Sequence, residues 1–355
     1  MMSVAAQTET PRVSVVIPTV RRREWLSEAI ASLQAQTVSD WEAIVVHDRA
    51  QVGGGLPQPL ALSAEDRRVR EFLGPLDRAG APACRNEGVR QSVAPYVVFL
   101  DDDDLLKPRC LERRIAKLDE TPELDMVVAQ SEVFSIVPGD EQLFWNEFRI
   151  ERDLDRFLRG DPAWQTAGPM WRRAFLERLG PWDEGALSWQ DWEYHTRALS
   201  LGCKYTRLND ADCYYRRPGA TSISFKSDSP DRVANRLAVI MRVRRFLSNA
   251  GQLTSVRNRD LTGVVCHLLM PETVTGRLEL QARSNLIASA MGFSLITDRV
   301  AALLYLYLRF RALRATFAAR SVRFVVQQLS GPSIPLASGQ HLRATRVCSP
   351  FKNCR

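Results

Sequence analysis

Short runs of β-branched and aliphatic residues, separated by stretches with helical spacing, restrict the fold of this chain more than any other feature. Such runs occupy residues 13–17, 43–46, 96–100 and 126–128. Apolar residues recur at helical intervals over residues 24–36, and Pro82 suits the first turn of a second helix over residues 83–93. Apolar strands that alternate with helices predict an α/β fold, with a mostly parallel sheet flanked by helices.

The second half of the chain has a different pattern. Helical spacing returns over residues 231–250, where Gly251 is expected to end the helix. We therefore expect an α/β domain over residues 1–230 and a helical C-terminal region over residues 231–330. The last segment, residues 331–355, contains Gly, Pro and Ser and is expected to be loosely ordered.

Three polar clusters come directly after the expected strands. They are Pro18 with Thr19, His47 with Asp48, and Asp101 to Asp104. The carboxyl ends of parallel strands lie at one edge of a sheet, where α/β proteins bind their ligands. The order of these clusters along the chain therefore predicts one site.

The four consecutive carboxylates at Asp101 to Asp104 repel one another unless a cation lies among them. Hard oxygen ligands favour Mg²⁺ or Mn²⁺, which in turn bind phosphate oxygens. The alternative is an acidic loop or helix N-terminus that faces water.

A second acidic segment contains Asp191 between Trp189 and Trp192. Aromatic neighbours that exclude water raise the pKa of a carboxylate, which suits a general base. An acid at a helix N-terminus, packed beside core aromatics, is an equally acceptable interpretation at this stage.

These motifs together resemble the family 2 glycosyltransferases, which are inverting enzymes with the GT-A fold. The matching segments, in the order of the family, are residues 13–19 (VSVVIPT), 43–48 (AIVVHD), 84–88 (CRNEG), 99–104 (FLDDDD), 190–193 (QDWE) and 215–218 (YRRP). The resemblance covers roughly residues 12–225. It implies a nucleotide-binding part at about 12–130 and an acceptor-side part at about 131–230.

The resemblance also implies a role for each matched residue. Asp191 corresponds to the catalytic base, and Asp101 and Asp103 form a D-x-D motif that holds Mg²⁺ or Mn²⁺. The residues expected at the nucleotide and its diphosphate are Pro18, Thr19, Asp48, Arg85, Asn86, Asp101, Asp102 and Arg216. Two positions depart from the family, because His47 and Gln190 stand where acids are usual.

The implied reaction moves a sugar from a nucleoside-diphosphate sugar to a hydroxyl of a glycan or lipid-linked acceptor, in cell-surface polysaccharide or glycoconjugate synthesis. Trp171, Trp182 and Trp189 are candidates for contact with the acceptor, although core packing is the commoner role of such residues. A catalytically degenerate scaffold at the membrane surface is the alternative. A metal-dependent phosphohydrolase would not require the Asp191 segment, and the glycines at 53–55 lack the spacing of a dinucleotide-binding dehydrogenase.

Positive charge is concentrated at the C-terminal end. The net charge is +7, but residues 299–355 contain ten Lys or Arg and no acid, so the preceding part is net acidic. Apolar residues at 300–308, followed by arginines, predict a helix that binds an anionic membrane surface. The alternative is packing on the catalytic domain or on a second subunit, so an oligomer is possible.

We expect a cytoplasmic protein, peripheral on the inner face of the membrane, since no apolar N-terminal segment is present. The cysteines include no CxxC pair, which argues against a zinc site. No nucleic-acid partner is expected, because basic residues are not interleaved with aromatic residues in an RNA-binding pattern.

Overall fold

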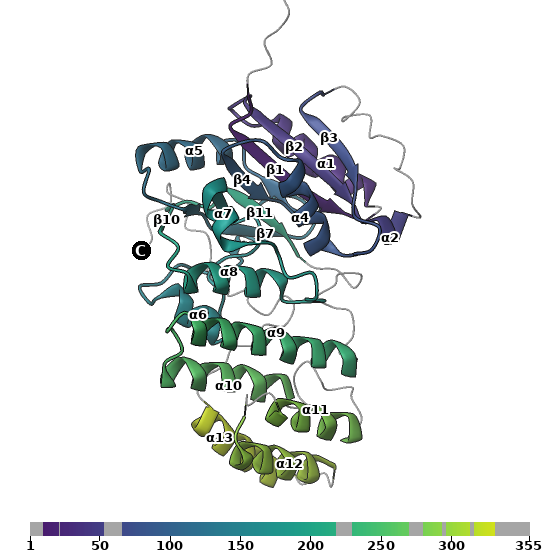
Figure 1. Cartoon of the computed structure of the whole chain (residues 1–355), viewed down its shortest axis with the longest axis vertical. Coiled ribbons are helices and arrows are strands. Elements are labelled where there is room, and N and C mark those ends of the chain that lie inside the picture. The colour runs from purple at the N-terminus through teal and green to yellow at the C-terminus, as the bar shows by residue number, and fades with distance from the viewer. Residues whose placement is uncertain are drawn as a thin grey trace, which may run out of the picture.

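The computed structural model describes residues 10–20, 22–52, 66–217, 229–269, 280–292, 296–312 and 316–330. The expected tail at 331–355 and the glycines at 53–55 lie outside these residues. The N-terminal part of the chain forms two sheets with helices packed on them, and the C-terminal part is helical (Figure 1).

The larger sheet has seven strands in the order β10-β6-β9-β4-β1-β2-β3. These strands are β1 (Val13–Thr19), β2 (Trp41–His47), β3 (Val69–Leu73), β4 (Tyr96–Phe99), β6 (Met126–Val128), β9 (Pro169–Arg172) and β10 (Tyr205–Arg207). Only β9 pairs antiparallel with its neighbours. The mostly parallel sheet predicted from the sequence is therefore confirmed.

The smaller sheet has four short strands in the order β5-β11-β7-β8. They are β5 (Leu105–Leu106), β7 (Ser131–Phe134), β8 (Leu143–Phe144) and β11 (Cys213–Arg216). Because β5 begins just after the four aspartates and pairs with β11, this sheet brings Arg216 to the acidic cluster.

Among the described residues, seven helices lie between the strands of the N-terminal part. Their bounds are α1 (Arg23–Gln34), α2 (Arg49–Val52), α4 (Ala81–Gln91), α5 (Cys110–Glu120), α6 (Asp153–Leu158), α7 (Arg173–Leu179) and α8 (Gln190–Ser200). The glycine of the CRNEG segment has a packing role in α4. A Cβ atom added at Gly88 would lie 2.3 Å from Val16 Cγ1, so only glycine lets α4 approach β1 this closely.

The C-terminal region contributes α9 (Pro230–Asn249), α10 (Ser255–Leu269), α11 (Leu280–Gly292), α12 (Asp298–Ala312) and α13 (Thr316–Ser330). Figure 1 shows them as successive layers below α8. Ser229 caps α9 by accepting a hydrogen bond from the Arg232 amide at 3.3 Å. Gly251, with φ of +64°, follows the helix as predicted.

One cluster of buried apolar side chains joins the two parts of the molecule. It extends from Val16 and Phe99 on the larger sheet through Trp192 on α8 to Val239 and Leu304 in the helical region. The C-terminal helices therefore share a core with the α/β part.

The expectation that three tryptophans contact an acceptor is wrong for two of them. Trp171 and Trp182 are 0% and 2% exposed, and both pack in the cluster described above. Trp182 stacks on Tyr194 with ring centroids 4.0 Å apart. Of the three, only Trp189 is partly accessible.

Candidate active site

The strand order explains why the polar clusters meet. β4, β1 and β2 are adjacent, so the residues that follow them lie at one edge of the larger sheet. The Asp48 amide donates to the Thr19 carbonyl at 3.0 Å, and the Thr19 hydroxyl donates to Asp102 Oδ2 at 2.6 Å. The predicted convergence of the three clusters is confirmed.

Two of the four carboxylates in the acidic cluster are buried, and Asp101 and Asp103 are partly exposed. Asp102 and Asp104 are 5% and 1% exposed. Burial, followed by repulsion from Asp103, raises the pKa of Asp102 to about 7, and burial and neighbouring carboxylates also raise the pKa values of Asp103 and Asp104. A carboxylate with a raised pKa gains stability when a cation approaches.

Arg22 lies next to the two middle carboxylates of the cluster. Arg22 Nη1 lies 2.8 Å from Asp103 Oδ2 and 3.5 Å from Asp102 Oδ1. Within the described ranges, no three acidic, His or Cys side chains converge to hold a metal ion as placed. The cluster nevertheless suits Mg²⁺ or Mn²⁺, because its carboxylates supply hard oxygen ligands and three of the carboxyl groups have raised pKa values.

Arg85 connects the acidic cluster to the second acidic segment. Its guanidinium donates to Asp101 Oδ1 at 2.5 Å and to Gln190 Oε1 at 3.2 Å. It also lies over the Trp182 ring, 4.5 Å from the centroid. Segments more than 80 residues apart in the sequence therefore meet at one arginine.

Asp191 lies in the first turn of α8, directly after Gln190. Burial raises the pKa of its carboxyl group, and Arg85 opposes that shift. One carboxylate oxygen accepts a hydrogen bond from the Trp192 amide at 2.9 Å. The rings of Trp189 and Trp192, its neighbours in the sequence, have centroids 6.0 Å apart.

Tyr215 on β11 is a site residue that sequence reasoning did not single out. Burial raises the pKa of its hydroxyl, with further contributions from Asp104, Asp103 and Asp191. It therefore lies within electrostatic range of both acidic segments. The sequence feature that could have identified Tyr215 is its position next to Arg216 in the segment 215–218 (YRRP).

Several residues expected at the nucleotide form hydrogen bonds with other parts of the protein. Asp48 accepts hydrogen bonds from the amides of Ala50 and Gly80 at 3.2 and 3.0 Å. Arg216 Nε donates to the Asp103 carbonyl at 3.0 Å, and Pro18 is buried within β1. Arg216 thus lies beside the acidic cluster, as expected from its predicted role.

Asn86 is the clearest case of such an internal contact. It donates to the Trp182 carbonyl at 3.0 Å and to Glu184 at 2.8 Å, and it accepts from the Trp182 amide at 2.8 Å. Its described contacts therefore hold the segment that precedes α8.

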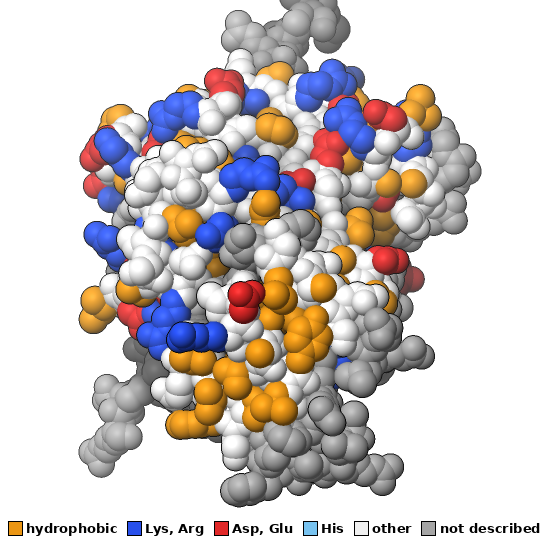
Figure 2. Space-filling view, turned by 60° about the horizontal axis from the view of Figure 1, so that its bottom comes forward, with side chains coloured by type: hydrophobic (Ala, Val, Ile, Leu, Met, Phe, Trp, Pro, Cys, Tyr) orange, Lys and Arg blue, Asp and Glu red, His pale blue; other side chains and the backbone are white. Residues whose placement is uncertain are grey.

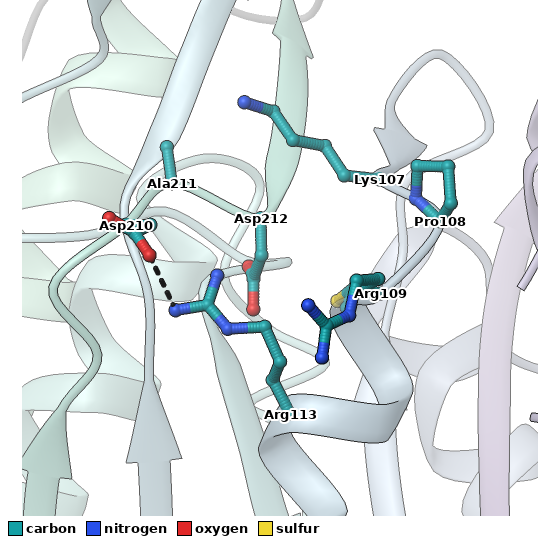
Figure 3. A pocket seen from close by; sticks show the side chains of 8 residues that line it. Lys107, Pro108, Arg109, Arg113, Asp210, Ala211 and Asp212 are labelled. Carbon is teal, nitrogen blue, oxygen red and sulfur yellow. Dashed lines mark hydrogen bonds and ion pairs between the residues drawn. The ribbon is translucent and has the colours of Figure 1, made fainter. Parts of the chain in front are cut away.

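A separate pocket lies where α5 begins (Figure 3). Its lining residues are Lys107, Pro108, Arg109, Cys110, Arg113, Asp210, Ala211 and Asp212. Each of its basic side chains forms an ion pair, as Arg113 does with Asp210 at 2.9 Å. This pocket therefore offers no uncompensated charge to an anionic ligand.

Comparison with known proteins gives a consistent picture. Residues 14–179 match the model of glycosyl transferase family 2. The chain is 26% identical to the uncharacterized glycosyltransferase YwdF of Bacillus subtilis over 198 residues, which are 53% of this chain and 68% of that protein. It is 34% identical over 110 residues to the GalNAc(5)-diNAcBac-PP-undecaprenol β-1,3-glucosyltransferase of Campylobacter jejuni, covering 31% of this chain but only 35% of that enzyme.

Among solved structures, the chain is similar to Staphylococcus aureus TarS 1–349 in complex with UDP-GlcNAc. The TM-score is 0.65 at 18% sequence identity, with 89% of this chain and 92% of that chain covered. This likeness concerns the fold, and it extends into the helical region. Residues 14–179 therefore match glycosyl transferase family 2, and the chain has the GT-A fold.

Proposed function

We propose that this chain transfers a sugar from a nucleoside-diphosphate sugar to an acceptor hydroxyl, with inversion at the anomeric carbon. The observation that carries the proposal is the contact of Arg85 with both Asp101 and Gln190. Through this contact the carboxylates suited to a metal-bound diphosphate lie near the acid suited to be the base. The arrangement brings donor and acceptor sites together, which supplies proximity.

In this proposal Asp191 accepts the proton of the attacking hydroxyl. Burial raises the pKa of its carboxyl group, which strengthens it as a base. The attacking oxygen forms a bond to the anomeric carbon as the bond from that carbon to the diphosphate oxygen breaks.

Asp101 and Asp103 are the proposed ligands of Mg²⁺ or Mn²⁺, with Asp103 as the direct ligand. A bound divalent ion would neutralise the charge that develops on the departing diphosphate. Arg22 must move away from Asp103 for that oxygen to bind an ion. Arg85 and Arg216, beside Asp101 and Asp103 respectively, are the proposed diphosphate contacts, and Pro18, Thr19, Asp48, Asn86 and Asp102 complete the proposed nucleotide site.

The relatives support a role in cell-surface glycan synthesis. The Campylobacter enzyme is named for an undecaprenol-linked acceptor, and the TarS structure contains UDP-GlcNAc. We therefore propose a lipid-linked or polymeric glycan as the acceptor, and UDP-sugars as the first donors to test.

We also propose that the C-terminal helices attach the enzyme to the inner face of an anionic membrane. In the part of the chain that the structure covers, no helix is both long and apolar enough to cross a bilayer. Figure 2 shows hydrophobic side chains gathered at the end of the molecule turned toward the viewer. Phe324, Val325 and Leu329 on α13 are 62%, 43% and 51% exposed. The arginines at 309, 311, 314 and 320 have side chains outside the described ones.

The acidic cluster predicts a pH-dependent stability. The folded pKa of Asp102, about 7, exceeds its ordinary value of 3.8, so the folded state binds more protons than the unfolded state between these values. Without metal, the Tm should therefore lose this contribution as the pH rises from about 4 to about 7. Asp102→Asn should reduce that loss, and Mn²⁺ should raise the wild-type Tm more above this window than below it. Identical pH profiles of Tm for the two proteins would contradict the assignment.

The base is tested by Asp191→Asn, which keeps the size of the side chain but cannot accept the proton. The kcat for sugar transfer should fall by about 10²- to 10⁴-fold, as is usual for loss of a general base. The Kd of the donor, measured by calorimetry, should stay near the wild-type value. Near wild-type turnover in this variant would eliminate Asp191 as the base.

Membrane attachment is tested by sedimentation with liposomes. Binding to anionic vesicles should exceed binding to neutral vesicles and should weaken with salt, because each basic residue near the surface contributes about 1 kcal/mol. Phe324→Ser should weaken it, whereas Val93→Ser, an exposed apolar position beside α4, should not. A wild-type protein that ignores anionic vesicles at low salt would refute membrane attachment.

A further inference from the structure

The segment between α7 and α8, residues 181–189, determines where α8 begins and hence where Asp191 lies. We call it the α8 entry loop. Its last residue, Trp189, has a φ of +59°. A left-handed conformation is unfavourable for a bulky side chain and persists only when the surroundings enforce it. The contacts of this loop therefore matter for the position of the base.

Asn235 on α9 holds the middle of the loop. Its Oδ1 accepts a hydrogen bond from the Leu187 amide at 2.9 Å, and its Nδ2 donates to the Gly185 carbonyl at 2.7 Å. One asparagine thus satisfies a backbone donor and a backbone acceptor that lie two residues apart, because its amide group carries both an acceptor and a donor.

Arg236 holds the end of the loop. It is 4% exposed, its Nε donates to Ser188 Oγ at 3.0 Å, and its guanidinium lies 5.4 Å from the Trp189 ring centroid. Arg242, farther along α9, forms an ion pair with Asp183 at 2.5 Å. Three side chains of one C-terminal helix therefore bind the loop along its length.

The α8 entry loop is also hydrogen-bonded to residues of the candidate active site. Ala186 lies between the two residues that Asn235 binds, and its carbonyl accepts a hydrogen bond from Gln190 Nε2 at 3.1 Å. Gln190 Oε1 accepts from Arg85, which donates to Asp101. An ionised glutamate at position 190 could accept from Arg85 but could not donate to Ala186. The glutamine that departs from the family pattern therefore suits this loop.

We propose that Asn235 and Arg236 are positioning residues for the transfer reaction. They fix the α8 entry loop, and through it they set the location of Asp191 and the contact of Gln190 with Arg85. The C-terminal helical region is then part of the catalytic apparatus. This inference rests on the proposed role of Asp191 as the base.

The test compares Asn235→Ala and Arg236→Met with Arg244→Ala in the full-length protein. Arg244 makes a comparable contact from α9, donating to Asn258 on α10 at 2.8 Å, but it does not contact the loop. The first two variants should lose about 10- to 100-fold in kcat, because a displacement of about 1 Å at a catalytic group has effects of this size. Their donor Kd should stay within about twofold of wild type, and Arg244→Ala should keep its kcat.

One further variant and one further measurement complete the test. Asn235→Asp, which can still accept from Leu187, should retain more activity than Asn235→Ala and serves if the latter does not fold. Hydrogen exchange of the amides at 183–191 should accelerate in Asn235→Ala and not in Arg244→Ala. Wild-type kcat in Asn235→Ala, or an equal loss in Arg244→Ala, would overturn the inference. Turnover retained by Asp191→Asn would instead overturn the proposed function, and this inference with it.

Discussion

The buried guanidinium of Arg85 is the interaction on which the arrangement of the site depends. It contacts Asp101, which follows β4, and Gln190, which begins α8, while its face lies over Trp182. A buried guanidinium without an anionic partner is unfavourable, and Arg85, whose side chain is 5% exposed, has such a partner in Asp101. Arg85 therefore offsets part of the repulsion in the acidic cluster and also fixes the distance between the two acidic segments.

The sequence predicted β1, β2, β4 and β6 because these strands are buried on both faces and read as continuous apolar runs. It did not predict β3, β9 and β10, and β3 and β10 are only partly buried. The same logic put Thr19, Asp48 and the four aspartates at one edge, since adjacent parallel strands end together. The smaller sheet was not predicted, because its strands have two to four residues and carry no recognisable pattern. Pairing between β11 and β5 in this sheet brings Tyr215 near both acidic segments. The local sequence gives no indication of that pairing.

The tryptophans show another limit of sequence reasoning. Their concentration before α8 indicated an aromatic surface for a sugar, but Trp171 and Trp182 complete the core between the larger sheet and α8. The position of the helical region was likewise not predictable. Helical spacing identified α9, but neither its capping serine nor its periodicity indicates which residues bind the segment before Asp191. Asn235 and Arg236 have no motif, and their significance arises only from the tertiary contacts.

In the proposed reaction, the acidic cluster binds a metal-associated sugar donor next to the base. Titration calorimetry of a UDP-sugar panel, with Mn²⁺ and with EDTA, tests it directly. Donor binding to the wild-type protein should require the metal, and Asp103→Asn should abolish the metal-dependent part of the binding. Asp210→Asn, which removes a carboxylate of the separate pocket near α5, should bind as wild type does. Equal donor affinity with Mn²⁺ and with EDTA, or unchanged metal-dependent binding in Asp103→Asn, would contradict the account.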